Sequence, residues 1–493
     1  MRFRRVILLF LLCMAGSAHA DPERPPDIVL KGSISGADNQ TYRALPFEVP
    51  SGIGRITIAF HYTGREQHTT IDLGLFDHER FRGWSGGNKA RFTLSETDAT
   101  PSYLPGPIGA GAWALQLGIP NIRKDAHSDY EADIWFDKVD ATPAVSAFSD
   151  APLKTGPAWY RGDLHMHTAQ SDGECASQSG RNIPCPLFKT VEAAAARGLD
   201  FIAISDHNAT SQFNEERELQ PYFDRLLLIP GREITTFYGH ANVLGPTGFI
   251  DFRLGGRETP DFNTMLTRIA ALGGIVSLNH PNSPSGEICM GCGWSAPNTD
   301  YSRVQAIEVV NGGLTAALGG LVESPISGIP FWEALLNKGY RLTAIGGSDN
   351  HNGPSTKPPV VGVPVTAVYA DSLSDRDILN AIRKGRVFVD AAGATTSVLE
   401  LTSGRAMMGE TIRVRARERV PFTVHVAGVL GNVISIVEDG QKIAPLGDAT
   451  IGFADERKSF VLRFDGKRHW LRADVRDAKG RLVLIGNPIY VNF

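Results

Sequence analysis

The sequence predicts an α/β protein in which a barrel of alternating strands and helices lies between two β-sandwiches. Short runs with an apolar residue at every second position occupy both ends of the chain, whereas near-continuous apolar runs alternate with helix-like stretches between them. The 493 residues include 52 Gly and 30 Pro, which is typical of many turns and short strands. Repetition of the strand and helix unit through the middle of the chain favours a barrel over an open sheet.

Residues 1–20 have the layout of a secretory signal peptide. Three Arg residues precede a short apolar run, and the segment ends on Ala18-His19-Ala20, which matches an A-x-A cleavage site. The apolar run is about half the length that a bilayer requires, so we predict no transmembrane anchor. A lipoprotein signal at Cys13 is disfavoured because Leu12 stands where such signals have a small residue. We therefore expect a periplasmic or secreted protein.

Cleavage would leave a more acidic chain with four cysteines. Loss of three basic residues moves the formal net charge from −4 to −7, and a chain this acidic, without a basic stripe, argues against a nucleic-acid partner. An even number of cysteines in an exported protein predicts two disulfides, with three possible pairings. The spacing Cys289-Met-Gly-Cys292 also suits a redox pair or half a zinc site. The remaining cysteines are Cys175, Cys185, Cys289 and Cys292.

Three domains are expected after the signal peptide. Residues 21–151 alternate, as in the run Arg55-Ile-Thr-Ile-Ala-Phe-His-Tyr62, and predict an N-terminal β-sandwich. Residues 155–395 hold the barrel, in which strand-like apolar runs follow helix-like stretches. Residues 396–493 alternate again and predict a C-terminal β-sandwich.

Six histidines lie in the predicted barrel, each near the end of a predicted strand or in a Gly-rich loop after one. The carboxyl ends of barrel strands meet on one face, where active sites form. Clustered imidazoles would repel one another if protonated, but neutral imidazoles can share metal ions, and nitrogen with oxygen donors suits zinc, manganese or iron. Carboxylates accompany them, including Asp206. The predicted metal ligands are His165, His167, Asp172, His207, Glu233, His240, His280, Asp349 and His351.

The order of these residues resembles a known family. In chain order, the motifs are Asp163-Leu-His-Met-His-Thr168, Ser171-Asp-Gly173, Ser205-Asp-His-Asn208, Pro230-Gly-Arg-Glu233, Gly239-His240, Asn279-His-Pro281 and Gly347-Ser-Asp-Asn-His351. As an ordered set, over roughly residues 155–395, they resemble the PHP family, which is named for polymerase and histidinol phosphatase. The segment Gly486-Asn-Pro-Ile-Tyr-Val491 resembles the end of the carbaryl hydrolase-like metallohydrolases, an exported branch.

The resemblance implies a distorted (β/α)7 barrel that binds two or three divalent metal ions. Asp172 stands where the family often has histidine. By the family's motifs, the first ion would take His165, His167, Glu233 and Asp349. Glu233 would bridge to a second ion, bound also by His240 and His280. The third ion would take Asp172, His207 and His351.

Clustered metal ions lower the pKa of a bound water towards about 7 and polarise the substrate, so we predict a hydrolase that uses a metal-bound hydroxide. The PHP resemblance favours a phosphoesterase, and the carbaryl hydrolase-like branch favours a carbamate, ester or amide hydrolase. A phosphate substrate would want basic residues at the rim, for which Arg232 and Lys357 are candidates, although each can instead be a solvent-facing charge. Asp206 or His207 could relay protons.

A binding protein is the alternative from another class. The sandwiches would then hold glycan or envelope while the barrel is inert, but degenerate barrels usually lose ligands and this set looks complete. The enzyme hypothesis implies a small-molecule substrate. The sequence does not determine which substrate it is, nor the oligomeric state.

Overall fold

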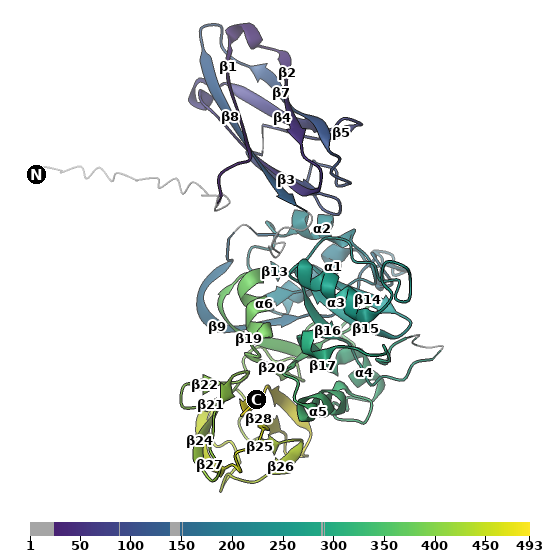
Figure 1. Ribbon diagram of the computed structural model, residues 1–493, viewed down its shortest axis with the longest axis vertical. Coiled ribbons are helices and arrows are strands. Elements are labelled where there is room, and N and C mark those ends of the chain that lie inside the picture. Colours follow the sequence, from purple (N-terminus) through teal and green to yellow (C-terminus); the bar gives the residue numbers. More distant parts are fainter. Residues whose placement is uncertain (1–23, 88, 139–147, 150, 287–288, 290) are drawn as a thin grey trace, which may run out of the picture.

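The computed structural model describes residues 24–493 except 88, 139–147, 150, 287–288 and 290 (Figure 1). The predicted signal peptide lies outside the described residues. Of the helices that the structure describes, none is both long enough and apolar enough to cross a bilayer. The N-terminal strands lie at one end of the molecule in Figure 1, the C-terminal strands lie at the other, and the helices lie between them.

Two four-stranded antiparallel sheets form the N-terminal part. Apolar residues alternate along each strand, so the two sheets share one hydrophobic core, and Leu115 and Leu117 on β7 are both fully buried in it. One sheet contains, in spatial order, β1 (Ile28–Ser35), β8 (His127–Lys138), β3 (Ile53–Tyr62) and β6 (Arg91–Ser95). The other contains β2 (Thr41–Val49), β7 (Gly111–Asn121), β4 (Thr70–Phe76) and β5 (Phe81–Gly86).

The largest sheet has eleven strands and continues from the middle of the chain into its C-terminal part. Its first strands are β13 (Leu227–Leu228), β12 (Phe201–Ile202), β9 (Lys154–Asp163), β19 (Val365–Leu373) and β20 (Val387–Asp390). It continues through β29 (Leu482–Gly486), β28 (His469–Arg476), β25 (Val433–Glu438) and β26 (Gln441–Ile443). β30 (Ile489–Val491) pairs with β28, and β23 (Thr411–Ile412) pairs with β30.

A five-stranded sheet carries the other central strands. β14 and β15 are antiparallel, as are β15 and β16, whereas β16, β17 and β18 run parallel. In spatial order the strands are β14 (Gly231–Thr236), β15 (Gly239–Leu244), β16 (Ile275–Leu278), β17 (Ala306–Asn311) and β18 (Thr343–Gly347). A separate two-stranded ribbon is formed by β10 (Glu174–Ala176) and β11 (Asn182–Pro184).

Helices cover the central sheets. α3 packs against β16, α5 against β17 and α6 against β19, each through an apolar face such as Ile378, Leu379 and Ile382 of α6. Asp261 and Ser374 cap α3 and α6 by accepting backbone N–H groups of the first turn. The helices are α1 (Leu187–Ala196), α2 (Gln212–Leu219), α3 (Phe262–Ala271), α4 (Gly312–Ala317), α5 (Gly328–Lys338) and α6 (Asp375–Arg383).

The predicted (β/α)7 barrel is wrong. The central strands of the described chain fall into two sheets, and neither sheet closes on itself. β14 and β15 form an antiparallel hairpin, and β19 is antiparallel to β9, whereas a (β/α) barrel is built from parallel neighbours. Alternation of apolar runs with helices does not encode which strands pair. The two sheets are joined by isolated bridges at Met166–Asn350 and His207–Glu233, where the chain leaves regular strand geometry.

The C-terminal strands do not form an independent sandwich. A four-stranded sheet of β22 (Ala406–Met407), β21 (Val398–Ser403), β24 (Arg419–Ala427) and β27 (Asp455–Arg463) shares a core with β25 and β28. β25 and β28 belong to the eleven-stranded sheet, which connects them to the central strands through the pairing of β29 with β20. Phe388 of β20 lies in the same core. The domain boundaries drawn from the sequence stay predictions.

Candidate metal centre

The first two predicted ligands directly follow β9. The buried carboxylate of Asp163, at the end of this strand, accepts hydrogen bonds from the backbone N–H groups of His165 (3.2 Å), Ser348 (2.9 Å) and Gly362 (2.7 Å). Asp163 thereby ties the segment after β9 to the segment after β18, which carries Asp349. Met166, between the two histidines, forms an isolated bridge with Asn350, and both His165 and His167 are buried.

The structure brings all nine predicted ligands together. Each of the nine contributes a nitrogen or oxygen atom to at least one group of possible ligands. Within each group, these atoms all lie within 4.8 Å of one another. The groups are His165, His167 and Asp349; His165, Glu233 and His280; and His167, Asp172, His207 and His351. A fourth group contains His240, His280 and Cys292.

Glu233 lies at the middle of the cluster. Its Oε1 atom is 3.4 Å from Nε2 of His165, 3.4 Å from Nδ1 of His240 and 3.5 Å from Nε2 of His280. Two ligand atoms of a tetrahedral metal ion lie about 3.4 Å apart, given metal–ligand bonds of about 2.1 Å. Glu233 therefore has the spacing of a ligand that shares ions with all three histidines.

Asp349 and Asp172 extend the cluster towards solvent. Oδ1 of Asp349 lies 3.3 Å from Nε2 of His165 and 3.2 Å from Nε2 of His167. Asp172 lies 3.6 Å from Nε2 of His207 and 3.4 Å from Nε2 of His351. The side chain of Asp172 is 56% exposed, whereas those of His165 and His167 are almost fully buried, so the third predicted site is the most accessible one.

Several buried atoms of the cluster make no hydrogen bond. Among the described residues these are Nε2 of His165, both ring nitrogens of His167, Oε2 of Glu233 and Nε2 of His240. Buried polar atoms in folded proteins are almost always hydrogen-bonded. Cations bound between these atoms would satisfy them, and the set of imidazoles and carboxylates fits zinc, manganese or iron. The residues present therefore fit the predicted metal ions.

The cluster favours positive charge. Burial opposes protonation of His165, but the surrounding carboxylates, Asp349 foremost, outweigh it and hold the pKa of this imidazole well above its usual value. Burial is likewise outweighed at His207, where Asp172 and Glu233 raise the pKa to about 10. The histidines in turn hold the pKa of the Glu233 carboxyl well below its usual range despite burial. Protons and metal cations therefore compete for one negatively charged site.

Two predicted ligands have a strained backbone. Asp349 has φ +51° and His280 has φ +28°, in the left-handed region that favours glycine. Strain of this kind costs about 1–3 kcal/mol and is found mainly where the surrounding structure holds a functional side chain in place.

The neighbours that orient the ligands include residues that we did not predict from the sequence. Glu308 of β17 lies with Oε1 2.8 Å from Nδ1 of His165, and Asn279 donates to Oε1 of Glu233 at 2.7 Å. Thr235 Oγ1 lies 2.6 Å from Nδ1 of His207. One signal for Glu308 was present, because it is a carboxylate inside the otherwise apolar run Ala-Ile-Glu-Val-Val.

Asp206, which we predicted as a proton relay, is engaged elsewhere. Its Oδ1 accepts the backbone N–H of Thr168 (2.7 Å) and the hydroxyl of Ser171 (2.6 Å), and its Oδ2 accepts the hydroxyl of Thr168 (2.6 Å). Asp206 thereby holds the loop that leads to Asp172. Its part in proton transfer stays a prediction, as does that of His207.

The two predicted substrate-binding residues differ in their exposure to solvent. Arg232 is 1% exposed, lies over the ring of Phe213 at 4.9 Å and donates to the carbonyl of Pro246 at 2.7 Å. It precedes Glu233 on β14 and so points to the opposite face of the strand, and we no longer expect it to contact substrate. Lys357 is exposed and lines an open cavity of about 380 Å³ together with Asp172 and His351.

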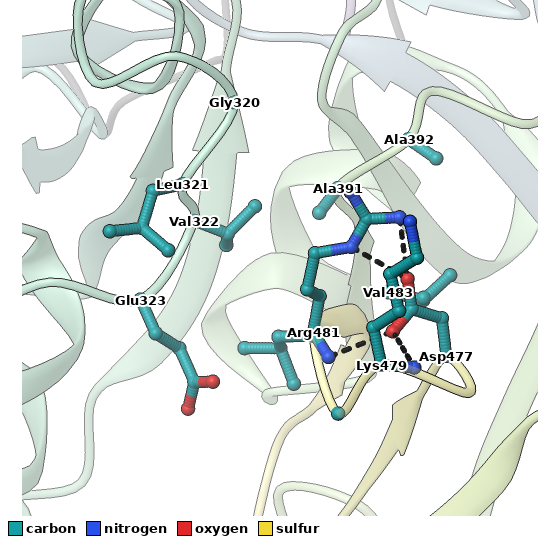
Figure 2. Close-up of a pocket in the computed structure, with 12 residues that line it drawn as sticks. Gly320, Leu321, Val322, Glu323, Ala391, Ala392, Asp477, Lys479, Arg481 and Val483 are labelled. Carbon is teal, nitrogen blue, oxygen red and sulfur yellow. Dashed lines mark hydrogen bonds and ion pairs between the residues drawn. The ribbon is translucent and has the colours of Figure 1, made fainter.

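The structure pairs the four cysteines among its described residues as Cys175–Cys185 and Cys289–Cys292. The first pair joins β10 to the segment after β11. A second cavity, of about 350 Å³, lies between the 320–323 loop and the hairpin that joins β28 to β29, where Asp477 and Arg481 form an ion pair (Figure 2). It contains none of the predicted site residues.

No family model and no curated protein matches the chain. Among solved structures, the chain is similar to a proposed metal-dependent phosphoesterase from Bifidobacterium adolescentis, with 15% identity and a TM-score of 0.27, over 45% of this chain and 94% of that one. It is also similar to the CARDB domain of a Pyrococcus furiosus protein, with 11% identity and a TM-score of 0.14, over 19% and 93%. TM-scores this low establish neither a shared fold nor a shared activity, and neither comparison supports the carbaryl hydrolase-like branch.

Proposed function

We propose that the protein is an exported metal-dependent hydrolase that cleaves phosphate esters. The convergence of nine histidine and carboxylate ligands around buried atoms that make no hydrogen bond carries this proposal. The ordered motifs that resemble the PHP family favour the same chemistry. The two disulfides are compatible with an exported protein.

Bound metal ions would supply Lewis acidity and a water of lowered pKa. The chain's own residues would hold the site in shape for that chemistry. Glu308 and Asn279 orient ligands through hydrogen bonds, and Asp206 fixes the 168–171 loop. Burial of His165 and Glu233 keeps bulk water from the inner part of the cluster.

Lys357 is the candidate for binding the substrate anion. Its exposed ammonium shares a cavity wall with Asp172 and His351, the accessible end of the cluster. A phosphate group that reaches the cluster through this cavity would pass the ammonium, and a cation there offsets the charge that otherwise repels an anion from the carboxylates.

A carbamate, ester or amide substrate is the second candidate, and one observation favours it. Phe237 is 90% exposed and Tyr238 is 42% exposed in the turn between β14 and β15, close in sequence to His240. An aryl group of a substrate could pack against these rings while its carbonyl reaches the cluster.

The test compares substrates on one preparation. The purified protein is stripped with a chelator and reloaded with Zn²⁺, Mn²⁺ or Fe²⁺, and then assayed with p-nitrophenyl phosphate, bis-p-nitrophenyl phosphate and p-nitrophenyl acetate. We expect metal-dependent turnover of a phosphate ester. Turnover of the acetate alone would favour the second candidate function. Fewer than about one bound metal ion per chain after reloading would refute the hypothesis of a metal-dependent enzyme.

Lys357→Ala tests the anion site separately. We expect a higher KM for the phosphate ester with little change for the acetate, because only the phosphate carries charge. The matched control is Lys189→Ala, an exposed lysine paired with Glu192 on α1, outside the residues that line the cavity. Equal effects of the two substitutions would contradict the assignment of Lys357.

A further inference from the structure

The Cys289–Cys292 disulfide lies beside the metal centre. Cys292 is fully buried, and its Sγ atom lies within 4.8 Å of a ring nitrogen of His240 and of a ring nitrogen of His280. Cys289 is exposed. One sulfur of the pair therefore faces the cluster, and the other can be reached from solvent.

The backbone around Cys292 is held independently of the disulfide. The carbonyl oxygen of Cys292 lies 3.2 Å from Nδ1 of His280, an arrangement that leaves Nε2 of this imidazole directed at Glu233, 3.5 Å away. The backbone N–H of Trp294 donates to the carbonyl of Pro281 (2.8 Å), and the backbone N–H of Ser295 donates to the carbonyl of Tyr238 (2.6 Å). Opening the disulfide would thus leave the Cys292 sulfur next to the two histidines.

A buried ring nitrogen of His240 lacks a partner. Nε2 of His240 makes no hydrogen bond with any described residue, although the side chain is only 7% exposed. Its other nitrogen, Nδ1, faces Glu233. A cation held between His240, His280 and a freed sulfur would bind a ring nitrogen of His240.

We propose that the Cys289–Cys292 pair is a redox switch on the metal centre, in which reduction frees Cys292 to become a thiolate ligand beside His240 and His280. This inference rests on the proposed metal centre and goes beyond its histidine and carboxylate ligands. In the disulfide, the sulfur is a poor ligand, because metals bind the thiolate form.

The switch needs a dithiol reductant, and the thiol–disulfide exchange begins at the exposed sulfur of Cys289. A thiolate of the reductant attacks Sγ of Cys289, the S–S bond breaks, and its electron pair leaves on Sγ of Cys292. The second thiol of the reductant then resolves the mixed disulfide. Cys289 ends as a thiol and the reductant as a cyclic disulfide, so two electrons have passed to the protein.

A thiolate changes which metal the site prefers. Sulfur is a soft donor that favours Zn²⁺ and Co²⁺ over Mn²⁺, whereas imidazole and carboxylate donors accept all three. The oxidised protein would therefore be the less selective form. We expect reduction to tighten Zn²⁺ binding by at least about tenfold, the lower end of what even an outer-shell partner contributes to metal affinity.

The test reduces the chelator-stripped protein with dithiothreitol, removes the reductant by anaerobic gel filtration, and then adds Co²⁺. The absorption spectrum is compared with that of Co²⁺-loaded protein that was never reduced. A thiolate-to-Co²⁺ charge-transfer band in the near ultraviolet is expected only after reduction. Cys289→Ser should show the band without reductant, because Cys292 is then permanently free, and Cys292→Ser should show it in neither state. The double variant Cys175→Ser/Cys185→Ser, which removes the other disulfide, should respond like the unaltered protein.

Three results would overturn the switch. Bound Co²⁺ without a thiolate band in the reduced protein would exclude Cys292 as a ligand and leave the proposed metal centre intact. A band that persists in Cys292→Ser would also exclude Cys292 as its source. Failure to bind Co²⁺ in both redox states would refute the metal centre and the switch together. The unaltered protein provides the first of these readouts without any substitution, so it does not depend on whether a variant folds.

Discussion

The Nδ1 atom of His165 lies 2.8 Å from Oε1 of Glu308, a carboxylate buried in β17. The other oxygen of Glu308 accepts the backbone N–H of His280 (2.9 Å) and the side-chain amide of Asn311 (3.0 Å). One carboxylate thus orients predicted ligands on two separate segments. Such a partner fixes the imidazole tautomer and leaves Nε2 of His165 for the metal.

Glu308→Gln should weaken metal binding by about 10–100-fold, the usual cost of losing an outer-shell partner. The amide keeps the shape of the side chain, so the fold should survive. Competitive titration against a chromogenic chelator measures the affinity. Glu400→Gln is the matched control, because Glu400 pairs with Nδ1 of His425 at 3.0 Å in the C-terminal strands. Equal losses in the two variants would show that the effect is not specific to the centre.

His165→Ala and Asp349→Ala should each abolish turnover without unfolding the chain. His165 belongs to two of the candidate ion-binding groups, and Asp349 lies within 3.3 Å of a ring nitrogen of His165 and of His167. We expect the metal content to fall and kcat/KM to drop by at least about a hundredfold, more than an outer-shell partner costs. His425→Ala controls for removing a histidine elsewhere. A near-normal rate with full metal content in either variant would rule out that ligand.

Metal affinity should rise with pH. In the metal-free cluster the pKa of His207 is raised to about 10 and that of His165 is raised well above its usual value, so both imidazoles bind protons more tightly than a free histidine does. A metal ion must displace those protons, and raising the pH removes the competitor. For each proton displaced, the affinity should change about tenfold per pH unit. Titrations at three pH values, with a dye that reports proton release, measure this slope, and an affinity that stays level between pH 6 and 8 would contradict it.

Asp98→Asn should destabilise the protein. Asp98 is fully buried and binds Arg55 of the N-terminal sheets at 2.6 Å and Arg217 of α2 at 2.5 Å. Burial raises the pKa of this carboxyl, but the two guanidinium groups outweigh it and hold the pKa below its usual range. Its stabilisation is therefore complete above the unfolded pKa, near 3.8, and is lost as the pH falls towards the lower folded value.

At pH 7, Asp98→Asn should lower the free energy of unfolding by about 3–5 kcal/mol, the usual cost of removing one partner of a buried ion pair. Urea unfolding measures it. Asp137→Asn is the control, since Asp137 is half exposed and pairs with Arg24 at 3.2 Å, and we expect less than about 1 kcal/mol there. A small effect of Asp98→Asn would mean that this contact does not hold the N-terminal sheets to the rest of the protein.

The sequence predicted the donors of the centre better than their supports. His165 and His167 could be predicted as candidate ligands because their local spacing is visible in a single chain. Glu308 and Asn279 act across many residues of sequence, and no local pattern links them to their partners. For Cys292 the sequence predicts only a disulfide, a redox pair or half a zinc site, and its approach to His240 and His280 appears only in three dimensions.

The fold shows the same limit. Period-two alternation correctly indicated short strands in residues 21–151, where the two faces of each strand differ in polarity. Apolar runs in the centre indicated buried strands, but burial on both faces carries no information about pairing partners or strand direction. The barrel was therefore inferred from repetition, and the β14–β15 hairpin and the antiparallel β19 exclude it.

By itself, the sequence determined which side chains carry donor atoms that suit a metal ion, because ligand chemistry belongs to the residue and its nearest neighbours. The tertiary structure decided which of them meet, and which charged residue faces away. Arg232 and Glu233 are adjacent in sequence, yet one packs against Phe213 and the other lies at the middle of the cluster. A strand sends successive side chains to opposite faces, and only the packing of the sheets determines which face is the site.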